Sequence, residues 1–174
     1  MKTANFVKSP LNYVGGKYKL LPQIIPLIPT DIHRFVDLFG GGFNVGVNIE
    51  CNHIIYNDIS AQVVDLLQHF YENSPEYIDE QIQNMTLQYG LSRLDTKNNF
   101  SEDYIKNQYI KLRNAYSEDP DWIKFYTLVT CAFSNQIRFN SKGEFNMSYG
   151  KRYYNISSPM SVTSISSSLA SLTI

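Results

Sequence analysis

The sequence has few of the residues that mark metal-bound, disulfide-linked or membrane-inserted proteins. Only two cysteines, Cys51 and Cys131, occur in 174 residues, and they lack metal-ligand spacing. They are predicted to be buried thiols, and no metal site is expected. No apolar run approaches the ~20 residues that cross a bilayer, and residues 1–8 lack the apolar core of a signal peptide. The sequence therefore predicts a cytoplasmic protein with no membrane association.

An excess of basic residues is also missing. The formal net charge is -1, whereas a nucleic-acid-binding domain is usually strongly basic. The charge is unevenly placed, because residues 72–80 are acidic and most charged residues between 132 and 154 are basic. Aromatic residues make up 14% of the chain and include many Tyr and Phe late in the sequence. Aromatics among cations suit base stacking, although a protein core is their usual place.

One glycine-rich segment, Phe35 to Ile49, organises the first part of the chain. The apolar residues around Asp37 predict a short buried parallel strand, and Gly40 to Gly42 allow a tight turn close to a ligand. A helix is expected to begin at Phe43 or Asn44. A second strand is expected at residues 53–57. It ends in Asp58, where nucleotide-binding folds place the carboxylate that holds ribose hydroxyls.

The glycine turn is open to more than one interpretation. It could be only a tight connection, since Gly-Gly turns are common. A dinucleotide fingerprint requires a third glycine three residues after Gly42, and that position is Val45. A pyrophosphate ligand is therefore disfavoured, and S-adenosylmethionine, which has ribose and adenine but no phosphate, fits as well or better.

Helix signals dominate the middle of the chain. Ser60, Ser74-Pro75, Ser101 and Asp119-Pro120 each precede a run of apolar residues at helical spacing, up to about residue 135. Residues 136–150 predict a β-hairpin whose turn places Gly143 at positive φ. Residues 156–174 are rich in serine and uncharged, which is typical of a disordered tail. The expected organisation is an α/β cofactor-binding part at 1–59, a helical subdomain with a hairpin at 60–155, and the tail.

Three motifs now stand in a specific order. They are Asn12-Tyr13-Val14-Gly15-Gly16-Lys17, then Phe39-Gly40-Gly41-Gly42 with Asp58, and then the segment from Arg138 to Asn146. Over residues 8 to 155 the chain resembles the Dam-type adenine-specific DNA methyltransferases. The resemblance implies an α/β, Rossmann-like fold that uses S-adenosylmethionine, with an inserted helical target-recognition subdomain and hairpin. It also implies methylation of adenine in a short duplex site, with GATC as the first to test.

The resemblance implies roles for individual residues. The cofactor-binding set is Tyr13, Lys17, Phe39, Gly40, Gly42 and Asp58, with Asp58 on the ribose hydroxyls. In the DNA-binding set, Arg138 matches an arginine that reads guanine and Phe133 matches an aromatic wedge, with Gln136, Asn140 and Lys142 as further contacts. Two simpler alternatives stay open. Arg138 could pair with Glu144 across the hairpin, and Phe133 could be a core residue four positions after Val129.

The family's catalytic Asp-Pro-Pro-Tyr motif does not occur in this sequence, so no catalytic residue is assigned. The nearest string, Asp119-Pro120-Asp121-Trp122, is interpreted as a helix start with proline at the first position. We expect a truncated chain that lacks the strands beyond the second and transfers no methyl group. The expected partners are double-stranded DNA and a cognate restriction endonuclease, with the protein a monomer. A catalytically inactive DNA-binding fragment is one alternative, and a nicotinamide-binding oxidoreductase, which Val45 opposes, is another.

Overall fold

The computed structural model of the chain describes residues 5–91, 100–152 and 172–173. The chain divides into two compact units, one formed by Met1–Pro75 with Pro159–Ile174 and the other by Glu76–Ser158. The expected boundary after residue 59 thus lies before the structural one, and the helix that follows it belongs to the first unit. In the described part of the chain, no helix has the length and apolar character needed to cross a membrane.

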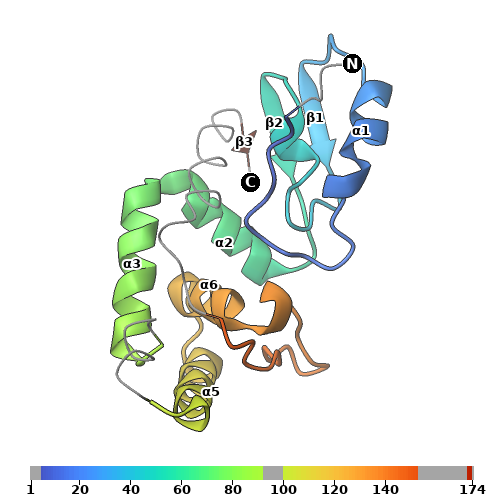
Figure 1. Cartoon of the computed structure of the whole chain (residues 1–174). Helices are drawn as coiled ribbons and strands as arrows, with labels where there is room; N and C mark the ends of the chain where they lie inside the picture. Colours follow the sequence, from blue (N-terminus) through green and yellow to red (C-terminus); the bar gives the residue numbers. More distant parts are fainter. Residues whose placement is uncertain (1–4, 92–99, 153–171, 174) are drawn as a thin grey trace. The chain divides into compact units, whose positions relative to one another are not determined.

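The first unit is built on a small parallel sheet (Figure 1). Strand β1 (Arg34–Asp37) pairs with β2 (His53–Tyr56), and β2 pairs with β3 (Leu172–Thr173), in the order β1-β2-β3. Asp37 is in register with Tyr56, so both strands end at the same edge of the sheet. Short helical turns precede the sheet, namely η1 (Tyr18–Leu20), α1 (Leu21–Ile24) and η2 (Ile25–Leu27). Helix α2 (Ala61–Glu72) follows β2 and buries Val63, Leu66, Leu67 and Phe70.

Three expectations for this unit need correction. The strand around Asp37 is half-exposed rather than buried, and Val36 is 50% exposed. The helix expected from Phe43 is wrong, because Phe43 has φ 63°, a value that no right-handed helix accepts, and only the 3₁₀ turn η3 (Gly46–Asn48) forms. A strand beyond the second was not expected, yet β3 is present. Its two residues are too few to give a periodic sequence pattern, and the hydrogen-bonding edge of β2 supplies its partner.

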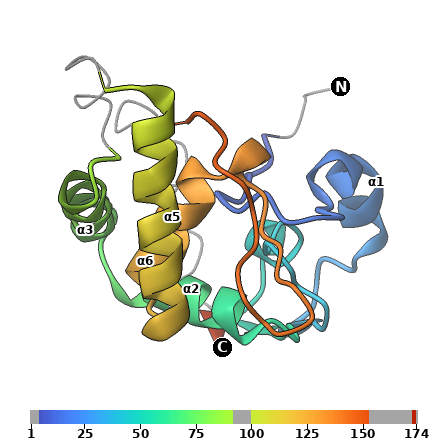
Figure 2. The same ribbon diagram turned by 90° about the horizontal axis from the view of Figure 1, so that it is seen from below.

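The second unit consists of helices followed by a doubled-back loop, drawn in orange in Figure 2. Its helices are α3 (Pro75–Gln88), whose first residue belongs to the first unit, α5 (Glu102–Glu118) and α6 (Trp122–Cys131), followed by the 3₁₀ turn η4 (Phe133–Asn135). The predicted start of α5 is confirmed, since the Ser101 hydroxyl accepts a hydrogen bond from the Tyr104 amide at 3.2 Å.

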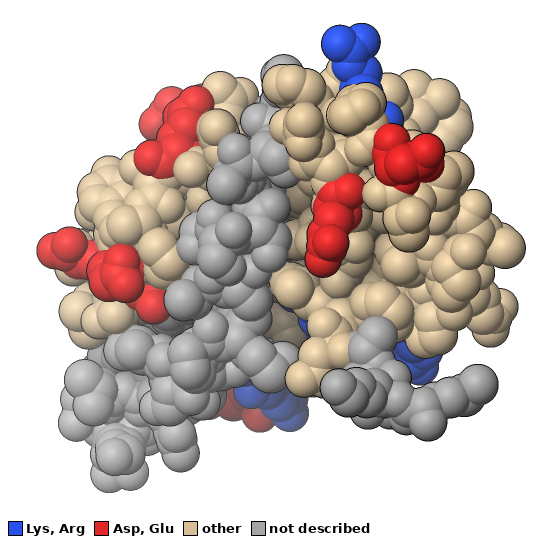
Figure 3. All heavy atoms as spheres, turned by 90° about the horizontal axis from the view of Figure 1, so that it is seen from above, with Lys and Arg blue, Asp and Glu red and all other residues tan. Residues whose placement is uncertain are grey.

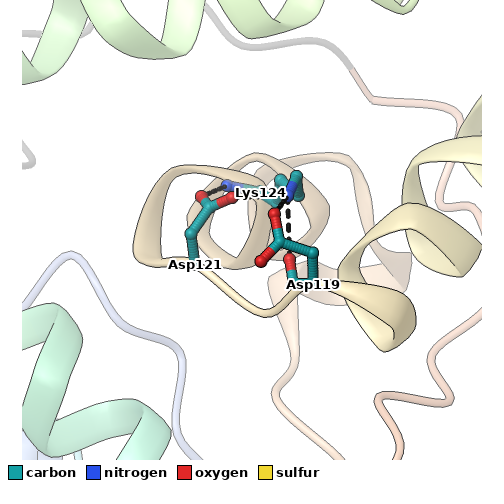
Figure 4. Close-up of polar contacts among 3 residues, drawn as sticks. All are labelled: Asp119, Asp121 and Lys124. Atoms are coloured by element: carbon teal, nitrogen blue, oxygen red, sulfur yellow. Dashed lines mark hydrogen bonds and ion pairs between the residues drawn. The ribbon is translucent and has the colours of Figure 1, made fainter.

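The start of α6 lies two residues later than expected. Asp121, not Asp119, is the N-cap, and its carboxylate accepts from the Lys124 amide at 2.8 Å. The Lys124 ammonium then joins Asp119 and Asp121, at 2.8 Å from each carboxylate (Figure 4). Burial lowers the pKa of Lys124, but the hydrogen bonds and charges of the two aspartates outweigh it and raise the pKa overall. A helix does start within Asp119-Pro120-Asp121-Trp122, as predicted, but its N-cap lies two residues later than expected.

The predicted hairpin at residues 136–150 is present only in part. Phe139 and Phe145 form an isolated antiparallel bridge, and Ala132 bridges Tyr149, but no continuous ladder forms between them. The turn is as predicted, since Gly143 has φ 77° and its amide donates to the Asn140 carbonyl at 3.0 Å. The segment is therefore a pinned loop rather than a two-stranded ribbon.

The two cysteines differ from each other. Cys131 is fully buried, as predicted, and burial raises the pKa of its thiol to about 12. Cys51 is only half-buried, because it lies in the bend before β2, so the prediction of a second buried thiol is wrong. Apart from Leu172 and Thr173, the expected disordered tail at 156–174 lies outside the described residues.

Candidate functional site

A pocket of about 210 Å³ lies in the first unit where β1 and β2 end. Ligands of open parallel α/β sheets bind beyond these carboxyl ends. All six predicted cofactor residues line it, although they come from three separate stretches of sequence. The lining residues are Tyr13, Val14, Gly15, Gly16, Lys17, Asp37, Phe39, Gly40, Gly41, Gly42, Asn44, Val45 and Asp58. Sequence reasoning missed Asp37 and Asn44 as pocket residues.

Side chains from β2 and the residues after it fix the backbone of the glycine turn. The Gly41 amide donates to Oδ2 of Asp58 at 2.8 Å, and the Gly41 carbonyl accepts from the Tyr56 hydroxyl at 2.7 Å. Gly41 has φ 50°, a conformation that favours glycine. Gly40 lies against the Tyr56 ring, and a Cβ at this position would overlap the ring atoms. The turn therefore requires glycine for a close approach and for a left-handed conformation.

Asp58 has a structural role beside its predicted ribose contact. Its Oδ1 accepts from the Ser60 amide at 2.9 Å, while Oδ2 accepts from Gly41. Two backbone donors thus hold the plane of the carboxylate. Each carboxylate oxygen has a second acceptor site, so Asp58 can still accept two hydroxyl groups of a ligand.

A second carboxylate, Asp37, shares the pocket with Asp58. Burial raises the pKa of Asp37, the hydrogen bond from the Gly46 amide at 3.0 Å opposes this rise, and the negative charge of Asp58 adds to it. Burial and the same Asp58 charge also raise the pKa of Tyr13. The pocket therefore carries negative potential at the strand ends, and the cation that lines it, Lys17, donates from Nζ to the Gly15 carbonyl at 2.6 Å.

Two asparagines fasten the amino-terminal arm, residues 7–11, beside the pocket. Asn48 accepts from the Val7 amide and donates to the Val7 carbonyl, both at 2.8 Å. Asn44 accepts from the Ser9 amide at 3.1 Å. The arm leads directly into Tyr13 and Lys17, so the side chains of Asn44 and Asn48 hold one wall of the pocket in place. An Asn-x-x-x-Asn spacing within residues 44–48 is the only signal of this arrangement in the sequence.

The predicted DNA-binding residues all lie in the second unit, after α6. Phe133 is 58% exposed, because α6 ends at Cys131 and its apolar face does not extend to residue 133. The alternative of a core role for Phe133 is therefore wrong. It stands beside Ser134 and Asn135, both of which have positive φ. Arg138 is exposed, and so is Lys142, whereas Gln136 and Asn140 are half-buried.

Arg138 does not form the alternative pair with Glu144. Its Nε donates to Oδ1 of Asn146 at 2.8 Å, and its Nη2 donates to the Asn146 carbonyl at 3.2 Å. The Glu144 carboxylate accepts instead from Asn140 Nδ2 at 2.7 Å. Figure 3 shows acidic side chains in several separate groups on the face drawn.

Comparison with known proteins identifies the family. Residues 13–174 match the model of the D12 class N6 adenine-specific DNA methyltransferases. The chain belongs to this family. The D12 family match includes the pocket residues from Tyr13 onward and the loop that carries Arg138, and the mixed helix and strand content fits a methyltransferase of this class.

Curated relatives of this D12 chain are methyltransferases. It is 43% identical over 150 residues to the Type II methyltransferase M.FokI of Planomicrobium okeanokoites, covering 86% of this chain and 22% of that protein. It is 35% identical over 158 residues to the Modification methylase StsI of Streptococcus sanguinis, covering 91% of this chain and 23% of that protein. It is 30% identical over 155 residues to the DNA N-6-adenine-methyltransferase of Escherichia phage P1, covering 85% of this chain and 18% of that protein. The chain thus spans about a fifth of the length of these relatives.

Proposed function

We propose that this chain holds S-adenosylmethionine in the pocket of its first unit and serves the methylation of adenine in double-stranded DNA. The observation that carries the cofactor assignment is the pair of carboxylates, Asp37 and Asp58, at the ends of two adjacent parallel strands. Burial raises the pKa of Asp37, and the negative charge of Asp58 adds to this rise. S-adenosylmethionine has a cationic sulfonium and a cationic ammonium group, so its binding would favour the ionised form of Asp37.

The same charge distribution argues against a nicotinamide dinucleotide. A pyrophosphate would bring further negative charge beside two carboxylates, and the repulsion between these like charges would weaken its binding. The positive φ at Phe43 also replaces the helix that a dinucleotide fold would place under a pyrophosphate. The oxidoreductase alternative is therefore the weaker proposal.

Each pocket group has a defined task in this proposal. Asp58 accepts the ribose hydroxyls with its free acceptor sites, the Gly40 to Gly42 turn passes beneath the cofactor, and Tyr13 and Phe39 supply aromatic walls. Phe39 is 87% exposed and can cover an apolar ring. S-adenosylmethionine supplies the methyl group that is transferred to the exocyclic nitrogen of adenine.

The DNA partner is assigned to the second unit, as its target-recognition part. Phe133 lies in η4, and the loop that follows it carries Gln136, Arg138, Asn140 and Lys142. Phe133, Arg138 and Lys142 are exposed. The target adenine must leave the duplex stack before its amino group can react. An exposed aromatic wedge can fill the space that the flipped base leaves.

The names of the relatives suggest the biological setting. Two of them are called a type II methyltransferase and a modification methylase, so we propose a cytoplasmic modification activity paired with a restriction endonuclease of the same site specificity. A monomer is the proposed state, and a duplex that contains GATC is the first substrate to test.

Titration calorimetry on the full chain tests the cofactor proposal. S-adenosylmethionine should bind, and NAD at the same concentration should not. An Asp37→Asn variant should bind S-adenosylmethionine more weakly, because it removes one of the two negative charges. Stronger binding of NAD than of S-adenosylmethionine would refute the proposal.

A further inference from the structure

We propose that Asn146 is a positioning residue that aims the guanidinium group of Arg138 at one guanine of the target site. The inference deepens the proposed DNA recognition and rests on it. Asn146 follows Arg138 by eight residues and faces it across the loop. The resemblance to known methyltransferases did not single out this asparagine.

The geometry of the contact fixes the guanidinium plane. Asn146 binds the guanidinium edge formed by Nε and Nη2. Nε donates to Asn146 Oδ1 at 2.8 Å, and Nη2 donates to the Asn146 backbone carbonyl at 3.2 Å. The remaining edge presents Nη1 and the second hydrogen of Nη2. Within residues 5–91, 100–152 and 172–173, Nη1 of Arg138 has no hydrogen-bond partner. That free edge matches the O6 and N7 acceptors of guanine in the major groove.

The backbone that carries the pair is firmly anchored. The residues on either side of the pair point inward, since Ile137, Phe145 and Met147 are buried while Arg138 is exposed. Phe145 joins an aromatic cluster whose rings lie 5.7 to 5.9 Å apart between centroids. The cluster contains Tyr116 of α5, Phe125 of α6, Phe139 and Phe145. The Asn146 amide also donates to the Arg138 carbonyl at 3.1 Å.

The support that Asn146 gives is neutral. An amide holds the arginine without cancelling its charge, whereas a carboxylate would form an ion pair and compete with the base. Across the part of the chain that the structure describes, no carboxylate lies within ion-pair distance of Arg138. Glu144, the nearest acid in sequence, is bound to Asn140. Arg138 therefore meets the duplex with a fixed orientation and its whole positive charge.

The test uses the full chain and a duplex library with a randomised stretch, sequenced before and after selection for binding. The unmodified protein should select sites with at least one invariant guanine, and Arg138→Ala should abolish preference at that position. Asn146→Ala should reduce preference at the same position about tenfold, with little change elsewhere. Asn146→Asp keeps the acceptor but adds a charge, so it should retain the guanine while weakening binding to all sites. Asn107→Ala, an exposed asparagine on α5, is the matched control and should change nothing.

Each outcome separates the two levels of the proposal. If the unmodified chain binds no duplex, or binds without sequence preference, the proposed DNA recognition fails and the role of Asn146 fails with it. If Arg138→Ala abolishes a guanine preference that Asn146→Ala leaves intact, only the positioning role is refuted. An Asn146→Ala variant that weakens all sites equally would make Asn146 a phosphate contact. Circular dichroism melting of each variant checks that the loss is local, because a misfolded loop would lower the melting temperature.

Discussion

Replacing Asn48 with alanine should release the amino-terminal arm from the cofactor pocket. Asn48 makes three hydrogen bonds of 2.8 Å, to the amide and carbonyl of Val7 and to the carbonyl of Asn44. Each is worth about 0.5 to 1.5 kcal/mol net, and the arm is part-buried, so its freed groups regain some water. Of these bonds, only the two to Val7 hold the arm, so the substitution should weaken the docking of the arm by about 1 to 3 kcal/mol. The wall formed by Tyr13 and Lys17 should then loosen, and the affinity for S-adenosylmethionine should fall.

Native-state hydrogen exchange measures this cost where it arises. At 1.4 kcal/mol for each factor of ten, the Val7 and Ser9 amides should exchange roughly 5- to 140-fold faster in Asn48→Ala, while the amides of α2 keep their rates. Asn52→Ala, an exposed asparagine in the bend before β2, should leave the arm unchanged. Equal acceleration across the whole first unit would show that Asn48 supports the fold generally and would refute the fastening role.

Three further outcomes are expected. Asp58→Asn should weaken S-adenosylmethionine binding by about 1.5 to 3 kcal/mol in calorimetry. Asp58→Ala should weaken it more, since it also removes the acceptor of the Gly41 amide. An unchanged dissociation constant would remove Asp58 from the cofactor site. The pKa of Asp37 is raised in the folded protein, so its contribution to stability is present below its ordinary pKa and is lost as the pH rises through the folded value. Asp37→Asn should thus raise the melting temperature at pH 7 more than at pH 3, and a gain independent of pH would contradict this. These 174 residues on their own should transfer no labelled methyl group to a GATC duplex. Adenine reacts only when acceptors align its lone pair with the sulfonium, and the Asp-Pro-Pro-Tyr motif that provides the acceptors in the family does not occur among these residues. Turnover above background, with a complete family member as positive control, would reveal an acceptor site that motif comparison missed.

Local sequence signals predicted much of this architecture. The strands around Asp37 and before Asp58, the Ser101 cap and the positive φ of Gly143 all follow from short patterns whose physics is complete within a few residues. The six expected pocket residues also come together in one pocket.

Features that depend on distant partners escaped prediction. The bonds from Asn44 and Asn48 to the arm span 35 and 41 residues, so the spacing of the two asparagines does not by itself reveal their partners. The helix expected at Phe43 fails because its ring packs edge-on against Tyr56, with centroids 5.4 Å apart, and the backbone turns left-handed there. Phe133 is exposed because α6 ends at Cys131, whereas helical periodicity alone extends the helix to residue 133.

The hydrogen bonds on either side of Gly41 have a consequence for how a ligand would bind. Glycine ordinarily brings conformational freedom to a loop, and ordering such a loop on binding reduces affinity. Here Asp58 and Tyr56 tie down the peptide groups before and after Gly41, so that entropy is already lost when the chain folds. The pocket floor is preorganised, and a cofactor would meet a surface that needs no rearrangement.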